Sequence, residues 1–506
     1  MTTGFWLRHS RSSARWVQLA LLSLLVGCGT QVVNPVSGRA ERSVMDESSE
    51  VAEGRKAHPQ ILAEYGVVAD TRLQAYVNQI GQRLAQQSHR TQLVWTFTVL
   101  DSSEINAFAL PGGFIYITRG LMAYLNDEAE LAGVLGHEIG HVTARHGAQQ
   151  ATRQQTAGAG VIAATLLGAV LEGAGVDGAT RLANQVSQGL AAGRLASYSR
   201  DQETQADRLG AEYLARNRYN PRNMIEVIAV LKAQERYAAD QARAEGRAAP
   251  SAPNWLASHP SNDKRLADIT QFASAYGGGF QDDGRNRYLQ AIDGMTFGDS
   301  REQGVVRGRQ FFHEGLGIAL TAPQGWTVQN AAEAISLING AGDAGVIVRL
   351  VPEKSGRTHE EIIRQLFNPS EGRVEKRQLN GLPATHFSGL RRDDRGAVRP
   401  IQVSVVTGPA QRMFLLLYAA RDANARQRSL AQMEQAENSF RPLGAAEAAL
   451  ARPYVLRSAP TPRGGLAQIA RSAPDPARAE AQLRLLNGVY GGGEEPAPGT
   501  MIKLVQ

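Results

Sequence analysis

The sequence predicts an α+β protein built from several units rather than from one compact domain. The chain has 506 residues, and a single hydrophobic core rarely grows beyond about 250–300 residues. Hydrophobic residues make up 43% of the chain and charged residues 20%, a balance typical of folded cores rather than of disorder. Segments with helical spacing of apolar residues alternate with strand-like segments, and no internal repeat is evident.

Composition also excludes several classes of protein. The formal charge is +6, and the three arginines at positions 8, 11 and 15 lie in a leader without acidic residues. The remainder is therefore nearly balanced, which argues against a nucleic-acid partner. A single cysteine excludes a disulfide framework and a thiolate zinc cluster.

Residues 1–27 have the features of an export signal. Arginines precede an apolar run, Trp16 to Val26, of signal-peptide rather than membrane-spanning length. The run ends at Gly27-Cys28, which resembles the lipobox of bacterial lipoproteins and predicts lipidation of Cys28 in the periplasm. Gly29 follows instead of aspartate, which favours the outer membrane by resemblance to sorting rules. An ordinary signal with an incidental cysteine is the alternative.

A polar tether is expected over 28–53, followed by a folded unit over 54–277. Its elements are predicted in order: a helix over 61–84, strands over 93–100 and 114–117, a helix opened by Asn126-Asp127-Glu128 and stopped near Gly147, and helices over 200–216 and 224–231. The uncharged stretch 156–171 is read either as a buried helical hairpin or as an interfacial helix facing lipid or a partner. The stretch 238–253 is expected to be flexible.

Glycines at 277–284 mark a boundary before two further units. Residues 285–445 alternate predicted strands and helices as an α+β domain, with spacings around Trp326 and Phe440 that resemble PsbP/Mog-like domains. Residues 446–506 resemble a LysM module in spacing, which implies peptidoglycan as a partner. The usual Gly-Asp-Thr turn is replaced by Pro462-Arg463-Gly464-Gly465, so a degenerate docking fold is the alternative.

The strongest chemical signal is the HExxH pattern, formed by His137-Glu138-Ile139-Gly140-His141. A spacing of four puts both histidines on one helical face, where they can share one Zn²⁺. Glu138 lies about 100° round the helix, near enough to reach a water at the metal without ligating it. Two structural core histidines are the alternative.

A catalytic zinc needs a third protein ligand and an open position. A metzincin would place a histidine where Gly147 stands, and His146 is one residue out of step, so we expect it beside the site or at the surface. Glu203, on a later predicted helix, is the better candidate. Asp207, one turn on, can accept the free N–H of a ligand histidine. These residues predict a zincin-like (gluzincin) peptidase fold for 54–277 with one zinc per chain.

Four motifs in this order carry a family resemblance: Asn106-Ala107-Phe108-Ala109-x-Pro111-Gly112-Gly113, Ile115 to Leu121, HEIGH followed by His146-Gly147, and Tyr198-Ser199-Arg200-x-x-Glu203-x-x-Ala206-Asp207. Over roughly 50–275 they resemble the HtpX/CAAX-prenyl-protease family of zinc peptidases, in its soluble periplasmic BepA-like branch. The resemblance implies His137, His141 and Glu203 as zinc ligands and Glu138 as general base. The tetratricopeptide array of that branch is not evident here, so its partners do not transfer.

Three further residues are candidates for helping the reaction. Tyr198, His259 and Arg265 can donate to a developing oxyanion. His259-Pro260 resembles the family's His-Pro element near the metal, so His259 is either an oxyanion donor or a removable fourth ligand, with an ordinary turn as the alternative. The strand 114–118 is expected either to be the edge on which an extended peptide adds or to be a core strand.

The sequence thus predicts a lipid-anchored periplasmic zinc endopeptidase for unfolded or misassembled envelope proteins. Strand addition needs an extended chain, which a folded substrate rarely offers. Two alternatives stay open: an envelope chaperone or assembly factor with a latent protease site, and a peptidoglycan-binding scaffold that uses the tail.

Overall fold

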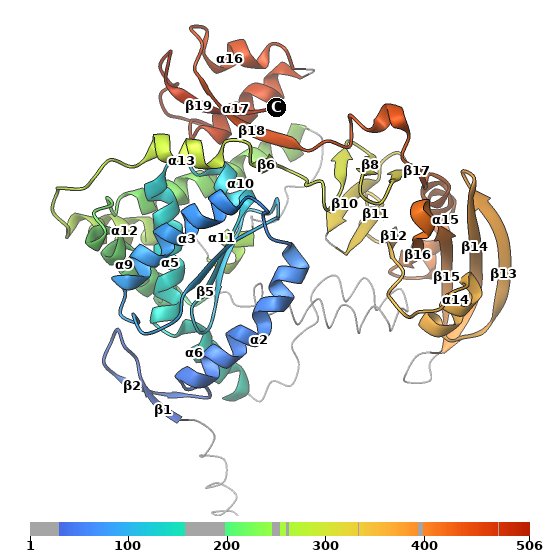
Figure 1. Ribbon diagram of the computed structural model, residues 1–506, viewed down its shortest axis with the longest axis horizontal. Helices are drawn as coiled ribbons and strands as arrows, with labels where there is room; N and C mark the ends of the chain where they lie inside the picture. The colour runs from blue at the N-terminus through green and yellow to red at the C-terminus, as the bar shows by residue number, and fades with distance from the viewer. Residues whose placement is uncertain are drawn as a thin grey trace, which may run out of the picture.

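The computed structural model describes residues 30–156, 198–244, 254–259, 263–331, 333–392, 398–473 and 475–506. The predicted signal segment, Cys28 and nearly all of the stretch 156–171 lie outside the described residues. Figure 1 shows a blue-to-green N-terminal unit, a central unit to one side of it and a red C-terminal module against the first. Among the described helices, none has the length and apolar character needed to cross a membrane.

The N-terminal unit is built on a three-stranded sheet. Its strands are β3 (Thr96–Leu100), β4 (Ala107–Leu110) and β5 (Phe114–Thr118), in the spatial order β3-β5-β4. β5 pairs with β3 in parallel and with β4 in antiparallel orientation. Of the two expectations for the strand 114–118, the core strand is confirmed and the edge is wrong, because both sides of β5 are hydrogen-bonded. The outer strands are β3 and β4.

Helices cover both faces of this sheet. On one face, Ile61 and Tyr65 of α2 (Glu47–Tyr65) pack against Phe108 and Tyr116. On the other face lie α3 (Thr71–Gln86) and α5 (Glu128–Thr143), followed by α9 (Arg200–Arg216), α10 (Asn223–Ala244) and α12 (Asp263–Ser274). All residues of α5 are buried, so the HExxH helix is the centre of the core.

The ends and neighbours of α5 follow from local chemistry. The predicted cap is confirmed: the Asp127 side chain accepts a hydrogen bond from the Glu130 N–H at 2.7 Å. The predicted stop at Gly147 is wrong, because α5 ends at Thr143 and Arg145 adopts a φ of 61° before α6 (His146–Thr156) begins. α5 approaches α9 closely at Gly140, where a Cβ would lie 2.9 Å from the Ala206 carbonyl oxygen.

The segment expected to be a polar tether is folded where it is described. It forms a hairpin of β1 (Thr30–Val33) and β2 (Ala40–Ser43), and α2 starts at Glu47. Glu50 of α2 is buried and accepts hydrogen bonds from Arg90 at 2.8 Å and from Arg145 at 2.5 Å. These ion pairs fasten the N-terminal segment to the end of the HExxH helix.

The C-terminal module shares the core of the N-terminal unit. β18 (Tyr454–Pro460), α16 (Gly465–Ala470), α17 (Pro476–Leu486) and β19 (Met501–Val505) follow one another, and the sheet order is β19-β18-β6. β6 (Thr296–Phe297) and α13 (Arg285–Ile292) belong with this module and the N-terminal core, although the sequence suggested that residue 285 opens the central unit. The buried Lys503 amine donates to the carbonyl oxygens of Ala123 and Leu125, just before α5.

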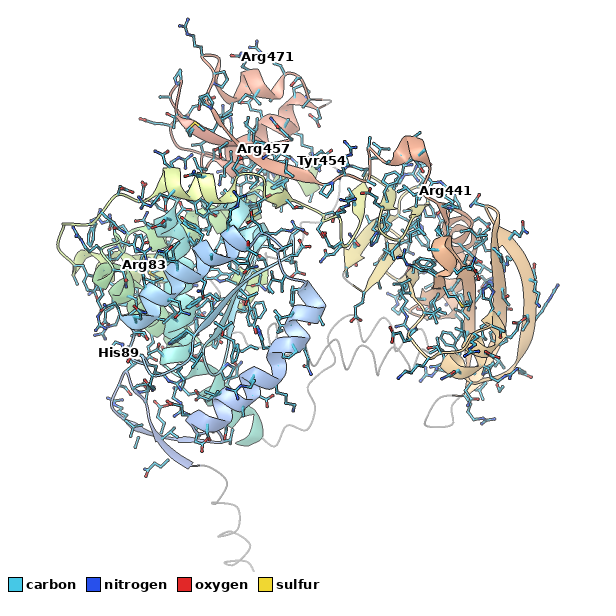
Figure 2. The ribbon with its side chains drawn as sticks, viewed as in Figure 1. Arg83, His89, Arg441, Tyr454, Arg457 and Arg471 are labelled. Carbon is cyan, nitrogen blue, oxygen red and sulfur yellow. The ribbon has the colours of Figure 1, made fainter. Side chains whose placement is uncertain are left out.

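The central unit is an α+β fold with two sheets. One has seven antiparallel strands in the order β10-β11-β12-β16-β15-β14-β13: Thr327–Ala331, Ala334–Ile338, Ala344–Leu350, Met413–Ala420, Val398–Thr407, Leu382–Arg392 and Pro369–Leu379. The other has the order β17-β9-β8-β7: Arg441–Pro442, Ile318–Thr321, Gln310–His313 and Val305–Arg307. Helices α14 (His359–Phe367) and α15 (Ala423–Asn438) pack on opposite faces of the larger sheet. Tyr454, labelled in Figure 2, stacks on the Arg307 guanidinium at 4.0 Å where the chain leaves this unit.

Candidate metal centre

Four candidate residues from three separate segments meet in the core of the N-terminal unit. His137 and His141 come from α5, Glu203 from α9, and His259 follows α11 (Asn254–Ser258). None is more than 3% exposed, and one ligand atom from each lies within 4.8 Å of all the others. The i, i+4 spacing of the two histidines explains why they face the same neighbour.

The spacing of these donor atoms fits one zinc ion. Nε2 of His137 lies 3.0 Å from Nε2 of His141 and 3.1 Å from Nδ1 of His259. Oε1 of Glu203 lies 3.4 Å from Nε2 of His141 and 2.9 Å from Nδ1 of His259. Tetrahedral bonds of about 2.0–2.1 Å require ligand atoms about 3.3 Å apart. Nitrogen and carboxylate oxygen are also the ligand types that zinc accepts.

The electrostatic setting keeps His141 and Glu203 in their ligating forms, whereas the carboxylates of Glu203 and Glu138 raise the pKa of His259 and favour its charged form. Burial lowers the pKa of His141 well below its usual value, so its imidazole is neutral. Burial alone would raise the pKa of Glu203, but the charge of His259 and hydrogen bonds from His141 and His259 hold it well below its usual value. A neutral imidazole and an ionised carboxylate are the states that bind a metal.

Asp207 and Arg265 support His137 from behind. Oδ1 of Asp207 lies 2.9 Å from Nδ1 of His137, and Arg265 contacts both Asp207 oxygens, at 2.6 and 2.8 Å. Burial would raise the pKa of Asp207, but the Arg265 guanidinium keeps it below its usual value. The ionised carboxylate therefore holds the Nδ1–H tautomer of His137, which leaves Nε2 free to ligate.

Arg265 is less suited to the oxyanion role that the sequence suggested for it. Besides gripping Asp207, it donates to the His259 carbonyl oxygen at 3.0 Å. Its Nη1 also forms an ion pair with Oε2 of Glu203 at 3.0 Å. The sequence placed Arg265 near the metal, and the structure shows that it ties α12 to α9 and His259.

Glu138 points into the site without joining the ligand cluster. The Trp255 indole donates to its Oε1 at 3.2 Å, and Nε2 of His259 lies 3.5 Å from the same oxygen. Its Oε2 is buried and accepts no hydrogen bond from the described residues. Because a buried carboxylate oxygen without a partner is costly, this atom is suited to a water or a substrate proton. Trp255 was not singled out from the sequence, where a lone tryptophan carries no signal of this role.

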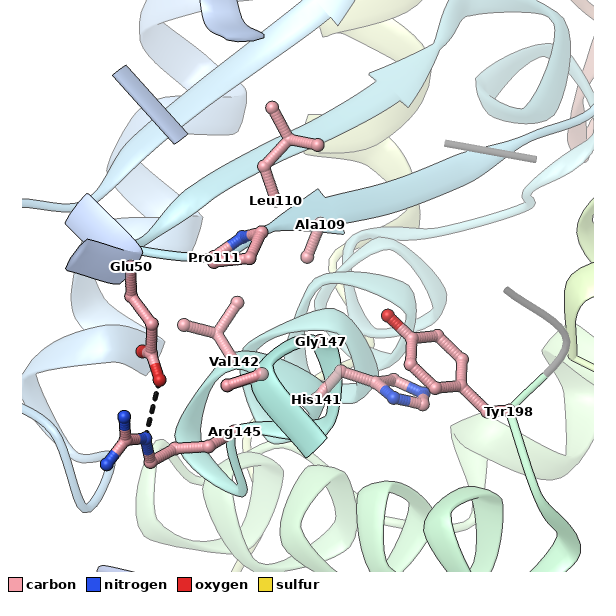
Figure 3. Close-up of a pocket in the computed structure, with 10 residues that line it drawn as sticks. Glu50, Ala109, Leu110, Pro111, His141, Val142, Arg145, Gly147 and Tyr198 are labelled. Carbon is pink, nitrogen blue, oxygen red and sulfur yellow. Dashed lines mark hydrogen bonds and ion pairs between the residues drawn. The ribbon is translucent and has the colours of Figure 1, made fainter. Parts of the chain in front are cut away.

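A pocket lies between His141 of the metal centre and β4, one of the two outer strands of the sheet. Figure 3 shows Ala109 and Leu110 of β4 on one side of it and His141 and Tyr198 on the other. The Tyr198 ring lies against His141, with ring centres 3.8 Å apart, and its hydroxyl points toward β4. His146 is buried, and its Nδ1 lies 2.9 Å from Nδ1 of His141. Of the two positions expected from the sequence, beside the site or at the surface, the first is therefore correct.

A buried HExxH helix facing a glutamate on a second helix, with one histidine oriented by a carboxylate, defines a zinc metallopeptidase domain of the gluzincin type. Residues 71–273 match the family model described as Peptidase family M48.

Proteins with similar sequences include bacterial and mitochondrial proteases. The chain is 30% identical over 244 residues to a beta-barrel assembly-enhancing protease of Yersinia pestis and 29% identical to that of Escherichia coli K12. Each match covers 47% of this chain and 47% of the relative, so the chain spans about half the length of these relatives. It is 28% identical over 245 residues to the mitochondrial metalloendopeptidase OMA1 of Schizosaccharomyces pombe, covering 47% of this chain and 65% of that protein.

Among solved structures, the cyanobacterial PsbP of Synechocystis is 13% identical, with a TM-score of 0.20, covering 29% of this chain and 98% of that chain. LpqN of Mycobacterium tuberculosis is 14% identical, with a TM-score of 0.20, covering 28% and 87%. Similarity at this level carries no conclusion about fold or role.

Proposed function

We propose that the protein is a zinc-dependent endopeptidase that cuts unfolded or misassembled proteins of the bacterial cell envelope. The observation that carries the proposal is the convergence of His137, His141 and Glu203 beside the unpaired Glu138 oxygen. The beta-barrel assembly-enhancing proteases similar to this chain support a role in envelope quality control. The periplasmic branch of the HtpX/CAAX-prenyl-protease resemblance supports the same role.

Each residue has a distinct task in the proposed reaction. Zinc, when bound by His137, His141 and Glu203, supplies a Lewis acid that polarises the scissile carbonyl and lowers the pKa of a water toward about 7. Glu138 takes a proton from the attacking water through its unpaired Oε2 and delivers it to the leaving amine. Asp207 holds His137 in place throughout, because Arg265 keeps the Asp207 carboxylate ionised.

We assign substrate binding to the pocket between β4 and the metal centre. β4 is an edge strand, and its residues Ala109 and Leu110 line the pocket beside His141. An extended peptide added to β4 would pass the metal centre with its backbone hydrogen-bonded. A folded protein rarely presents such a segment, which is why the proposed substrates are unfolded. The Tyr198 hydroxyl, which points toward β4, is the better-placed oxyanion donor.

His259 is proposed to hold the site closed. Its Nδ1 lies among the ligand atoms, 2.9 Å from Oε1 of Glu203, while its Nε2 lies 3.5 Å from Oε1 of Glu138. The ring thus stands between the metal ligands and the general base, where the water of hydrolysis is needed. A catalytic zinc keeps one position open, and His259 would fill it. In an active protease His259 would leave the metal position when substrate binds, whereas in the latent-protease alternative it would stay there.

Anchoring at the outer membrane through a lipid on Cys28 is proposed from the lipobox resemblance alone. Cys28→Ser should move the protein from the membrane fraction to the soluble fraction of cells. Retention of this variant in membranes would contradict the anchor.

The C-terminal module is proposed to be LysM-like, with docking onto the peptidase domain as its main role. Its strand–helix–helix–strand order supports the LysM-like fold. The contacts of the buried Lys503 with Ala123 and Leu125 support docking onto the peptidase domain. Pull-down with purified peptidoglycan tests the scaffold alternative, since a docking module should stay in the supernatant.

The proposed activity is tested with unfolded casein as substrate. The zinc-loaded full chain should cleave casein, and a chelator should stop cleavage until zinc is restored. A zinc-loaded protein that binds casein but leaves it intact would favour the chaperone alternative.

A further inference from the structure

The outermost strand of the central unit, β13 (Pro369–Leu379), is a long open edge. It pairs with β14 on one side and ends the seven-stranded order, and no other described strand pairs with it. Figure 1 shows β13 at the outer margin of the molecule, away from the N-terminal unit. The side chains from Glu371 to Lys376 are all exposed, and Val374 in their middle is 48% exposed. An edge of this length is a template for a further strand unless something blocks it.

The charges along β13 are self-complementary. On one face of the strand, Glu371, Arg373, Glu375 and Arg377 alternate in sign. If a second β13 runs antiparallel about a two-fold axis through Val374, Glu371 faces Arg377 of the second copy and Arg373 faces Glu375. The two-fold symmetry makes each of these contacts occur twice, so each of the four charged residues faces an opposite charge in the other copy. On the other face, the exposed Val374 meets its own copy.

This register opposes more unlike charges than its neighbours do, four pairs against two when the strands are centred on Gly372. Directly opposed residues of an antiparallel pair lie on the same face of the sheet, so the pairing can shift only by two residues at a time. Each such shift moves the two-fold axis by one residue along β13. Centring the pair on Arg373 places Arg373 against its copy and Glu371 against Glu375. Centring it on Glu375 places Glu375 against its copy and Arg373 against Arg377. Like charges directly opposite each other are destabilising, so both shifts are disfavoured.

Charged residues on an edge strand usually serve to prevent pairing. A run of one sign would do so against a second copy, because every register would bring like charges together. The alternation about Val374 does the opposite in one register. Arg377 lies 3.6 Å from the buried Glu437, which accepts hydrogen bonds from Ser404 of β15 and Tyr418 of β16, so its side chain leans inward over the sheet. The Arg373–Glu375 pairs are therefore the main charged contacts of the pairing.

We propose that two copies of this chain pair antiparallel through their β13 strands, centred on Val374, and join their seven-stranded sheets into one. This interface lies in the central unit and does not depend on the proposed peptidase activity.

Charge reversal at exposed positions tests the pairing by sedimentation velocity on the full chain. The wild-type chain should form a concentration-dependent dimer. Arg373→Glu and Glu375→Arg should each be monomeric, because each places two pairs of like charges in the interface. An equimolar mixture of the two variants should recover a dimer, and the double variant Arg373→Glu/Glu375→Arg should dimerise alone. Arg72→Glu, an exposed change on α3, is the matched control and should dimerise like wild type.

A disulfide tests the register. In a chain carrying Cys28→Ser, Val374→Cys should cross-link to its copy under mild oxidation, because directly opposed residues have Cα atoms about 4.5–5.5 Å apart. Lys376→Cys should not, since its copy lies about 13 Å further along the strand pair. The proposal is overturned if wild type stays monomeric, if the reversed variants still dimerise, if mixing fails to restore the dimer, or if both cysteine variants cross-link equally.

Discussion

Asp207 Oδ1 lies 2.9 Å from Nδ1 of His137, on the side of the ring opposite the ligand cluster. The same carboxylate is gripped by Arg265 through both of its oxygens. Helix α12 is thereby linked through α9 to the HExxH helix, and the orientation of one proposed zinc ligand depends on a residue 128 positions away.

Asp207→Ala should weaken zinc binding about 10–100-fold, because His137 loses the partner that fixes its tautomer. Competition with a chromophoric chelator measures the affinity. Asp201→Ala, an exposed acidic position on the same helix, is the control and should bind zinc normally. Equal affinities for both variants would remove Asp207 from this role, provided that circular dichroism shows both to be folded.

His137→Ala and Glu203→Gln should each lose stoichiometric zinc, since each removes one of the proposed ligands from a buried site. Metal analysis of the purified proteins gives the zinc content directly. If both variants keep one zinc per chain, the proposed ligand set is wrong.

Glu138→Gln should retain zinc and the fold but lose about 10²–10⁴-fold in casein hydrolysis, as expected for removal of a general base. Glutamine keeps the contact with the Trp255 indole, because its amide oxygen can still accept that hydrogen bond. Near-normal turnover with zinc bound would exclude Glu138 from proton transfer.

His259→Ala should raise the hydrolysis of unfolded casein if His259 closes the site, because the position between the ligands and Glu138 becomes open. If His259 instead donates to the oxyanion, the same change should lower turnover about 10²–10³-fold with little effect on zinc content. The sign of the change decides between the two roles. Unchanged activity together with unchanged zinc affinity would leave His259 as a turn residue.

Lys503→Met should lower the free energy of unfolding of the peptidase domain by about 1–3 kcal/mol, because the buried carbonyl oxygens of Ala123 and Leu125 lose their donor. Thermal melts followed by circular dichroism measure the loss. The exposed Lys56→Met on α2 is the control and should melt like wild type.

The same lysine predicts a pH dependence. Burial lowers the pKa of Lys503 from 10.5 to about 7 in the folded state, while burial and Asp127 raise the pKa of the neighbouring Glu130 to about 8. From pH 8 to 10.5, Lys503 is then mostly neutral when folded and protonated when unfolded. Because the unfolded chain binds more protons, the unfolding free energy of wild type should rise with pH relative to Lys503→Met in this window. A constant difference between the two proteins would contradict the shift.

The sequence by itself determined the features that depend on local spacing. The separation of four residues puts His137 and His141 on one side of α5, and the same separation puts Glu203 and Asp207 on one side of α9. The Asp127 cap was also readable, because a cap and its helix are neighbours in the chain. These short-range rules were enough to predict the metal centre and the class of the domain.

The tertiary structure alone decided what depends on distant partners. The sequence predicted no strand over Ala107–Leu110, so it left open whether the strand 114–118 is an edge or a core strand. The pairing of β5 with both β3 and β4 decides for the core strand. The segment 28–53 reads as a tether because Glu50 looks exposed until Arg90 and Arg145, 40 and 95 residues away, bury and neutralise it. The packing of Lys503 against the start of the HExxH helix spans 378 residues, and such contacts leave no periodic trace in a sequence.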